Sequence, residues 1–492
     1  MYDGIRLCSV RAAAVVVNTK AQPCGATIIR SVHPAAACPK PDKAWVLAAA
    51  VLGSTMAFVD ESVVNVALPK IEVDLHTTLA GMQWVINAYT LCMSALLLIG
   101  GAAADRYGRR VLFLMGIITF AMASIICGCA PNVAALIAAR AIQGVGAAML
   151  IPCSLAIIGA AFDEQERGAA IGIWSGASAL AAGAGPLLGG WLVDHLSWRA
   201  IFLINPLIAI PTLWIAVRRV PESGDFTART SLDWLGAVLA FGGLGGLVYG
   251  LIAVSRLGWQ DVTVVGSVTA GTLLLAGFTL QERRSPVPMM PLRLFESRSF
   301  SGVNLLTLLL YGALGGAFFF LPFLLIQAHG FSATAAGAVY LPFTLVLAVL
   351  SRWSGSLVDR FGARWPLIIG PLIAGVGFAL LAAVSGERRY WFYLGPMVVL
   401  GFGMAITVAP LTTTVINSVE ERQTGVASAV NNVVAAVASL LVIAVLGTLV
   451  ADSLVSTARV VMWAAAALAL AGAAAAALTI RPKRSDRVEL ER

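Results

Sequence analysis

Three charged residues inside apolar stretches are the side chains of this sequence best suited to chemistry. Asp60 and Glu61 are adjacent in the apolar run 44–68, and Arg140 lies in the apolar run 133–158. A buried carboxylate exchanges protons nearer to neutral pH than an exposed one does. A charge inside a membrane span is costly, so it marks either a functional site or an ion pair. The three residues therefore predict a proton-exchange site or a structural pair between Asp60 and Arg140.

Helical geometry brings Asp60 and Arg140 to a similar depth. At a rise of 1.5 Å per residue, Asp60 lies roughly 13 Å from the end of its run and Arg140 roughly 10 Å from the start of its own. Glu61 lies about 100° further round the helix, so only one of the adjacent acids is expected to face a cavity fully. Arg140 would then tune the proton affinity of its partner acid and release it on protonation.

A short charged motif occurs twice, each time between two apolar runs. The copies are Gly101-Ala-Ala-Ala-Asp105-Arg106-Tyr-Gly108-Arg109-Arg110 and Gly355-Ser-Leu-Val-Asp359-Arg360-Phe-Gly362-Ala-Arg364. The carboxylate can pair with an Arg or with a helix N-terminus, where a negative charge is favoured by about 0.3–1 kcal/mol. We interpret both copies as conformational latches, and the alternative is a tight turn fixed by glycine. The repetition also indicates an internal duplication.

The elements that carry these residues follow from composition. Hydrophobic residues make up 59% of the chain and charged residues 12%, whereas soluble domains contain about 25% charged residues. The apolar residues fall in blocks of about twenty, the length of a helix that crosses a bilayer. The sequence therefore predicts an all-α polytopic membrane protein. Its fourteen spans are expected at approximately 44–68, 81–104, 111–130, 133–158, 169–192, 200–217, 234–254, 262–280, 302–327, 335–357, 366–384, 391–414, 424–450 and 460–480.

Charge predicts the orientation and the domain organisation. An even number of spans puts both termini on one side, and the alternate loops hold only six of the 33 Lys and Arg residues, so both termini are expected in the cytoplasm. The second motif copy follows span 10, which fits two six-helix bundles with two inserted helices and a cavity between the bundles. The expected divisions are a basic, disordered tail at 1–43 (or a start codon assigned too far upstream), bundles at 44–217 and 301–480, an insert at 218–300 and a cytoplasmic tail at 481–492.

Other kinds of chemistry have little support. The four histidines lie in the tail or in loops, and the seven cysteines show no spacing typical of a metal site, so we expect neither catalytic residues nor a metal. There is no Gly-rich phosphate-binding loop that ends in Gly-Lys-Ser or Gly-Lys-Thr, so an ion gradient is favoured over ATP as the energy source. No cofactor and no nucleic-acid partner are expected.

The duplicated motif resembles the signature loops of the major facilitator superfamily, and fourteen spans are similar to its drug:proton antiporter branch (EmrB/QacA-type multidrug efflux transporters). Asp60 through Pro69 resembles the helix 1 motif of that branch, and Arg140-Ala-Ile-Gln143-Gly144 is similar to the superfamily motif of helix 4. Gly185-Pro186-Leu-Leu-Gly189-Gly190 resembles a motif of exporters. Trp198-Arg199 and Phe202-x-x-Asn205-Pro206 also fit the branch.

The resemblance implies a proton-coupled exporter of amphipathic, in part cationic, small molecules in the cytoplasmic membrane. It favours Asp60 over Glu61 as the proton-carrying acid, with Arg140 as its modulator. Gly176 and the Gly-Pro segment would shape the exporter helix. The cavity candidates are Trp84, Asn87, Tyr89, Gln143, Trp174, Asn431 and Asn432. The alternatives are a proton symporter, a narrow exporter of one metabolite or antibiotic, and a polytopic membrane sensor or enzyme.

Overall fold

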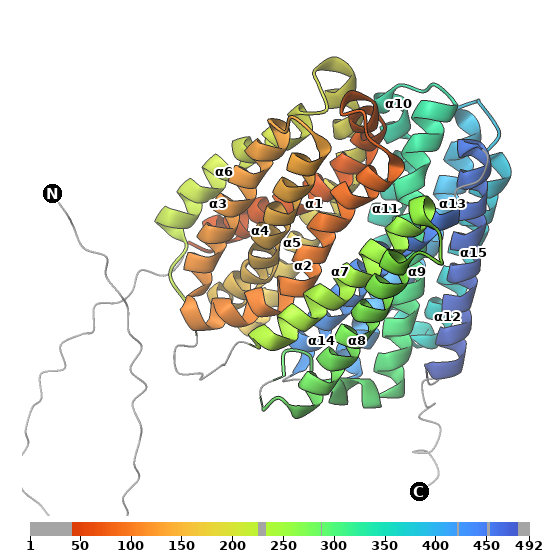
Figure 1. The fold of residues 1–492 in the computed structure, drawn as a ribbon. Helices are drawn as coiled ribbons and strands as arrows, with labels where there is room; N and C mark the ends of the chain where they lie inside the picture. The colour runs from red at the N-terminus through yellow and green to blue at the C-terminus, as the bar shows by residue number, and fades with distance from the viewer. Residues whose placement is uncertain (1–41, 225–232, 287, 421–422, 450–452, 481–492) are drawn as a thin grey trace, which may run out of the picture.

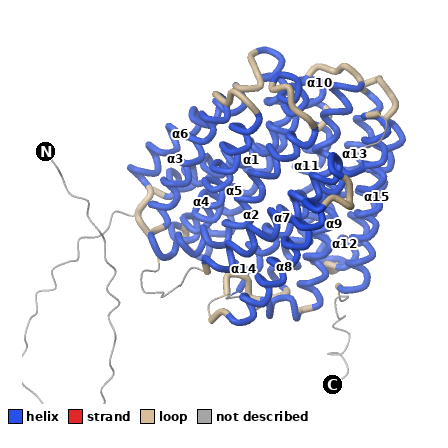
Figure 2. The backbone as a smooth tube through the Cα atoms, in the orientation of Figure 1, coloured by secondary structure: helices blue, strands red, loops and turns tan. Residues whose placement is uncertain are grey.

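The computed structural model describes residues 42–224, 233–286, 288–420, 423–449 and 453–480. Every regular element in these ranges is a helix (Figure 2). Fourteen helical segments of the described residues are long and apolar enough to cross a membrane, which confirms the predicted all-α polytopic class. Apart from Asp42 and Lys43, the two predicted tails lie outside the described residues.

The first six helices pack together and carry the first motif copy (Figure 1, red to olive). They are α1 (Lys43–Asp74), α2 (Leu79–Tyr107), α3 (Arg109–Gly128), α4 (Val133–Ala161), α5 (Glu164–His195) and α6 (Ala200–Arg219). The helix α1 continues past Pro69 through the polar segment Lys70–Asp74, beyond the end predicted at residue 68. Hydropathy marks the apolar part of a helix and not its last hydrogen bond, so the prediction was too short.

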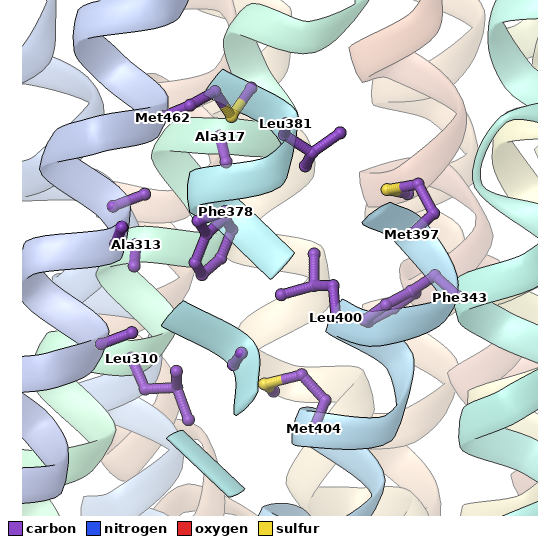
Figure 3. Close-up of a cluster of buried hydrophobic side chains, with 14 of the residues drawn as sticks. Leu310, Ala313, Ala317, Phe343, Phe378, Leu381, Met397, Leu400, Met404 and Met462 are labelled. Carbon is purple, nitrogen blue, oxygen red and sulfur yellow. The ribbon is translucent and has the colours of Figure 1, made fainter. Parts of the chain in front are cut away.

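The C-terminal helices form a second group (Figure 1, green to blue). They are η1 (Leu292–Glu296), α9 (Arg298–Phe323), η2 (Leu324–Ala328), α10 (Ala333–Ala338), α11 (Leu341–Phe361), α12 (Arg364–Val384), α13 (Trp391–Asn417), α14 (Thr424–Leu446), η4 (Gly447–Leu449) and α15 (Leu454–Thr479). Their core is apolar, and its buried residues include Phe378 of α12 with Leu400 and Met404 of α13 (Figure 3).

One predicted span is not a continuous helix. The span expected at 335–357 is divided into α10 and α11, and Pro342 lies at the start of α11. Proline lacks a backbone N–H and is most readily accommodated in the first turn of a helix, which is the position that Pro342 takes in α11. The division matters for the site because α10 meets α5, as described below.

The helices α7 (Trp234–Leu257) and α8 (Val262–Arg284) pack against each other between the two groups in the sequence. The helix α7 contacts α2 of the first group and α14 of the second, so the pair covers one seam between the groups (Figure 1, bright green). Side chains of Asp233 and Asp261 cap the first turns of α7 and α8, which satisfies backbone donors that helix formation leaves open. The domain limits proposed from the sequence remain a prediction.

Candidate functional site: a buried ion pair within the first bundle

Asp60 lies midway along α1 and is 1% exposed. Its Oδ2 forms an ion pair with the Arg140 guanidinium of α4. Its Oδ1 accepts hydrogen bonds from Gln143 Nε2 at 2.7 Å and from Asn205 Nδ2 of α6 at 2.8 Å. The pairing of Asp60 with Arg140 was predicted from their depths and is present. Three donors from two other helices therefore enclose this carboxylate.

Arg140 makes hydrogen bonds and a ring contact in addition to its ion pair with Asp60. Its Nε donates to the Val85 carbonyl at 3.2 Å, its Nη1 donates to Gln143 Oε1 at 2.9 Å, and its Cζ lies 4.2 Å from the centroid of the Tyr89 ring. The spacing of Arg140 and Gln143 places both on one face of α4. Such a network satisfies a buried charge on several sides, which is the condition for keeping an ion pair away from water.

Sequence reasoning missed two members of this network. Asn205 had been noted only as part of a family segment, and Ser124 had not been noted at all. Asn205 Nδ2 donates to Ser124 Oγ at 2.9 Å, and Ser124 Oγ donates to the Phe202 carbonyl at 2.8 Å. Polar residues inside the apolar spans of α3 and α6 were the available signal, but serine is common in such spans and only the packing shows its partners.

Glu61 differs from Asp60 in its exposure, although the two are adjacent. Its residue is exposed, and no described side chain donates to its carboxylate. Its carboxylate still lies close enough to Arg140 and Asp60 to interact electrostatically with both. The structure thus separates the two acids into an enclosed one and an accessible one.

In the first motif copy, two charged side chains four residues apart form an ion pair. Arg109 Nη2 donates to Asp105 Oδ1 at 2.8 Å, and Arg109 Nη1 donates to the Ala156 carbonyl of α4 at 3.3 Å. Gly108 between them has φ +105°, in the region that favours glycine. Glu222, which follows α6, accepts hydrogen bonds from the backbone N–H groups of Arg110 and Val111 at the start of α3.

The second copy repeats part of this geometry. Gly362 also has a positive φ, +70°. Arg364 Nη2 donates to the Ala477 carbonyl of α15 at 2.9 Å, and Arg110 makes the equivalent contact to the Val217 carbonyl of α6. The corresponding contacts support an internal duplication. Gly355, Asp359 and Arg360 belong to α11, but their side chains lie outside the described set. In the first copy, Gly101 faces Pro152 and the Arg106 guanidinium lies 5.4 Å from the Tyr107 ring.

The glycines of α5 make close contacts at one end of the helix and none at the other. A Cβ on Gly185 would lie 1.8 Å from Ser62 Oγ, and one on Gly190 would lie 2.1 Å from the Ala333 carbonyl oxygen of α10. A Cβ on Gly189 would also meet α1, at 2.9 Å from Val63. By contrast, a Cβ on Gly176 would have no atom within 4 Å. The predicted exporter segment is therefore where α5 packs against α1 and α10.

Polar contacts close the molecule at this same end, which we call the Asp194 end. The Asp194 carboxylate of α5 accepts hydrogen bonds from the backbone N–H groups of Ala333 and Thr334 at 3.0 and 2.7 Å, and from Thr334 Oγ1 at 2.6 Å. Gln327 Nε2 donates to Glu72 Oε2 at 2.7 Å. Toward the other end, positions 168, 172 and 176 of α5 all face open space. The two bundles meet at the Asp194 end, and toward the other end the glycine face of α5 is uncovered.

The cavity candidates have separate environments. Tyr89 and Gln143 belong to the Asp60 network. Trp84 packs toward α7, with its ring 6.2 Å from that of Tyr249, and Trp174 is buried and donates to Ser54 Oγ at 2.8 Å. Asn431 joins α14 to α9 by donating to Asn304 Oδ1 at 3.0 Å and Thr307 Oγ1 at 2.8 Å, whereas Asn432 is exposed. Asn87 is fully buried, and its amide has no described hydrogen-bond partner.

Comparison with known proteins finds relatives that are similar in sequence over most of this chain. The chain is 35% identical over 411 residues to the tetracenomycin C resistance and export protein of Streptomyces glaucescens, which covers 82% of this chain and 76% of that protein. It is 36% identical over 421 residues to a puromycin resistance protein of Streptomyces alboniger, which covers 84% of this chain and 83% of that protein. Both relatives match most of the described helices.

Solved structures share the fold at lower sequence identity. A bacterial homolog of the human lysosomal transporter Spinster superposes with a TM-score of 0.65 at 19% identity, covering 90% of this chain and 98% of that one. The xylose transporter XylE from E. coli superposes with a TM-score of 0.63 at 14% identity, covering 90% and 98%. The sequence profile described as Major Facilitator Superfamily matches residues 50–443. With the duplicated motif and fourteen membrane-spanning helices, this match shows that the chain is a multi-pass membrane protein that belongs to the major facilitator superfamily.

Proposed function

We propose that this protein is a proton-coupled exporter of amphipathic, in part cationic, small molecules across the cytoplasmic membrane. The observation that carries the proposal is the fully enclosed pair of Asp60 and Arg140, with the accessible acid Glu61 beside it. The printed roles of the relatives, export of tetracenomycin C and resistance to puromycin, support a substrate of the drug or antibiotic class. No cofactor is needed, because a proton gradient would supply the energy.

Coupling follows from the competition for the Asp60 carboxylate. Protonation removes its negative charge, and the interaction with the Arg140 cation then weakens from an ion pair to a hydrogen bond between a cation and a neutral carboxyl group. Arg140 retains Gln143, the Val85 carbonyl and the Tyr89 ring, so it has other partners when the acid is neutral. Glu61 is the acid that an incoming proton or a cationic substrate meets first, since Asp60 itself is enclosed. The pair thus serves as the energy-coupling group and Glu61 as its accessible neighbour.

Alternating access is the second part of the proposal. The Asp194 end is closed by hydrogen bonds between α5 and α10, whereas the face of α5 that carries Gly168, Gly172 and Gly176 meets open space. With both termini in the cytoplasm, as the charge distribution predicts, this arrangement opens toward the cytoplasm and would load substrate from there. The two motif copies would act as latches on the cytoplasmic side when that end closes. Release then requires the Asp194 contacts to break.

Inverted membrane vesicles that carry the protein test the proposal. A vesicle interior made acidic should drive uptake of ethidium by the wild type, and uptake should collapse with the gradient. Asp60→Asn should abolish gradient-driven uptake, because the amide cannot exchange the coupling proton. Asp261→Asn is a matched control, since it replaces a half-buried carboxylate at the start of α8, outside the Asp60 network, by an equally good helix cap.

The outcomes separate the remaining candidates. Full pH-dependent uptake by the Asp60→Asn variant would refute the coupling assignment. Substrate efflux from the vesicles under the same gradient would indicate symport. No movement of ethidium or of other amphipathic cations would favour a narrow exporter, and the next probe would be tetracenomycin C or puromycin, the compounds named for the relatives.

A further inference from the structure

A second buried acid lies far from Asp60 in the sequence, at the end of α8. Only four residues of this 23-residue helix are buried, and Glu282 is one of them, at 3% exposure. Its Oε2 accepts a hydrogen bond from the backbone N–H of Met290 at 2.9 Å. Its Oε1 is buried and has no hydrogen-bond partner among the described residues. Such an unpaired oxygen is unusual, because buried polar atoms are nearly always hydrogen-bonded.

The start of α7 supplies a second oxygen in the same condition. Asp233 Oδ1 caps the helix by accepting from the Gly236 N–H at 2.8 Å, but Asp233 Oδ2 is buried without a described partner. A Cβ built on Gly236 would lie 3.0 Å from Asp233 Oδ2 and 3.1 Å from Glu282 Oε1. The two unpaired oxygens therefore converge on the same side of Gly236.

Two ionised carboxylates in this position would repel each other, and each would keep a lone pair without a donor. One proton resolves both difficulties, because it removes one charge and provides the missing O–H donor. We propose that Glu282 and Asp233 share a proton, which makes this carboxyl–carboxylate pair a second proton-binding site, on helices other than those of the Asp60 network. A hard metal cation fits less well, since it takes six or more oxygen ligands and the described residues contain no group of three or more His, Cys, Asp or Glu side chains that could hold one.

The surrounding charges do not offer another partner. Arg283 and Arg284 at the end of α8, and Arg293 and Glu296 in η1, are all exposed. Among the described residues, Asp233 is the charged side chain that lies beside Glu282 at Gly236. The proton in this site is therefore controlled by the pair itself.

The site joins three segments of the chain. Asp233 begins α7, Glu282 ends α8, and Met290 lies in the segment that leads through η1 to α9. When the proton leaves, repulsion between the two carboxylates would loosen the inserted pair from the start of the second bundle. This proposal stands apart from drug export, because it concerns a proton that is bound whether or not substrate moves.

Infrared spectroscopy of the purified full chain in lipid nanodiscs tests the site directly. A protonated carboxyl group has its own C=O absorption, separate from that of a carboxylate. At neutral pH the wild type should show a protonated-carboxyl band that is missing in Glu282→Gln and that disappears from the wild type at high pH. Glu296→Gln, which removes an exposed acid of η1, should keep the band.

Asp233→Asn provides a second, independent variant. Asn caps a helix as well as Asp does, and its amide N–H can donate to Glu282 Oε1 in place of the shared proton. The band should therefore also be lost in this variant. The melting temperature of the wild type should fall on raising the pH by more than that of either amide variant, because only the wild type gains two adjacent buried charges. A wild-type spectrum identical to that of Glu282→Gln at every pH would overturn the proposal, and a band that survives in Asp233→Asn would overturn the sharing of the proton.

Discussion

The energetic coupling between Asp60 and Arg140 is the most direct test of the central network. Arg140→Gln leaves the enclosed Asp60 carboxylate without its cation, and removing one partner of a buried ion pair costs about 3–5 kcal/mol of unfolding free energy. Gln143 and Asn205 still donate to Asp60 at 2.7 and 2.8 Å. The expected loss is therefore at the lower end, about 3 kcal/mol. Asp60→Asn leaves Arg140 unpaired in the same way, and a loss of about 3 kcal/mol is expected again.

The double variant isolates the interaction free energy between Asp60 and Arg140 from the contributions of their other contacts. In the variant that combines Asp60→Asn with Arg140→Gln, neither charge of the pair remains. Neutral replacements of a buried ion pair are often tolerated. We expect a total loss of about 3 kcal/mol in place of the roughly 6 kcal/mol that additive effects would give, hence a coupling free energy of about 3 kcal/mol.

Denaturant unfolding of the purified variants in one detergent, followed by helical circular dichroism, measures the cycle. The pair of Arg109 and Asp105 is the matched control, because their side chains are 24% and 42% exposed and sit four residues apart. An exposed pair of this kind should couple by only about 0.3–0.5 kcal/mol. Additivity within about 0.5 kcal/mol at Asp60 and Arg140 would show that the two charges are stabilised independently, and it would refute the argument that protonation of one releases the other.

Three further variants test the bundle contacts. Gly108→Ala should destabilise the protein by about 1–2 kcal/mol in thermal unfolding, because its φ of +105° disfavours a side chain. Gly337→Ala should lower the thermal stability, since its Cβ would lie 2.0 Å from the Pro186 carbonyl oxygen, whereas Gly176→Ala, which meets open space, should change it little. Asn431→Ala should lower unfolding free energy by about 1–3 kcal/mol, measured by denaturant titration, because two buried hydrogen bonds to α9 are lost.

The sequence by itself determined the class of this protein and much of its plan. Apolar blocks of bilayer length give the number of spans, because a helix in lipid must satisfy its own backbone hydrogen bonds. The duplicated motif identified the equivalent glycines Gly108 and Gly362, both of which have a positive φ. The depth of Asp60 and Arg140 predicted their pairing, because a helix converts residue number directly into distance.

Only the tertiary structure decided how the charged residues are divided between enclosed and accessible positions. Asp60 is sealed and Glu61 is exposed, although the two are neighbours in one span. Asn205 completes the network from α6, far from Asp60 in the chain. Glu282 and Asp233 likewise meet only because α7 packs along α8. A single helix fixes depth and direction, but which side chains meet depends on how neighbouring helices are rotated and packed against it, and that is a property of the whole fold.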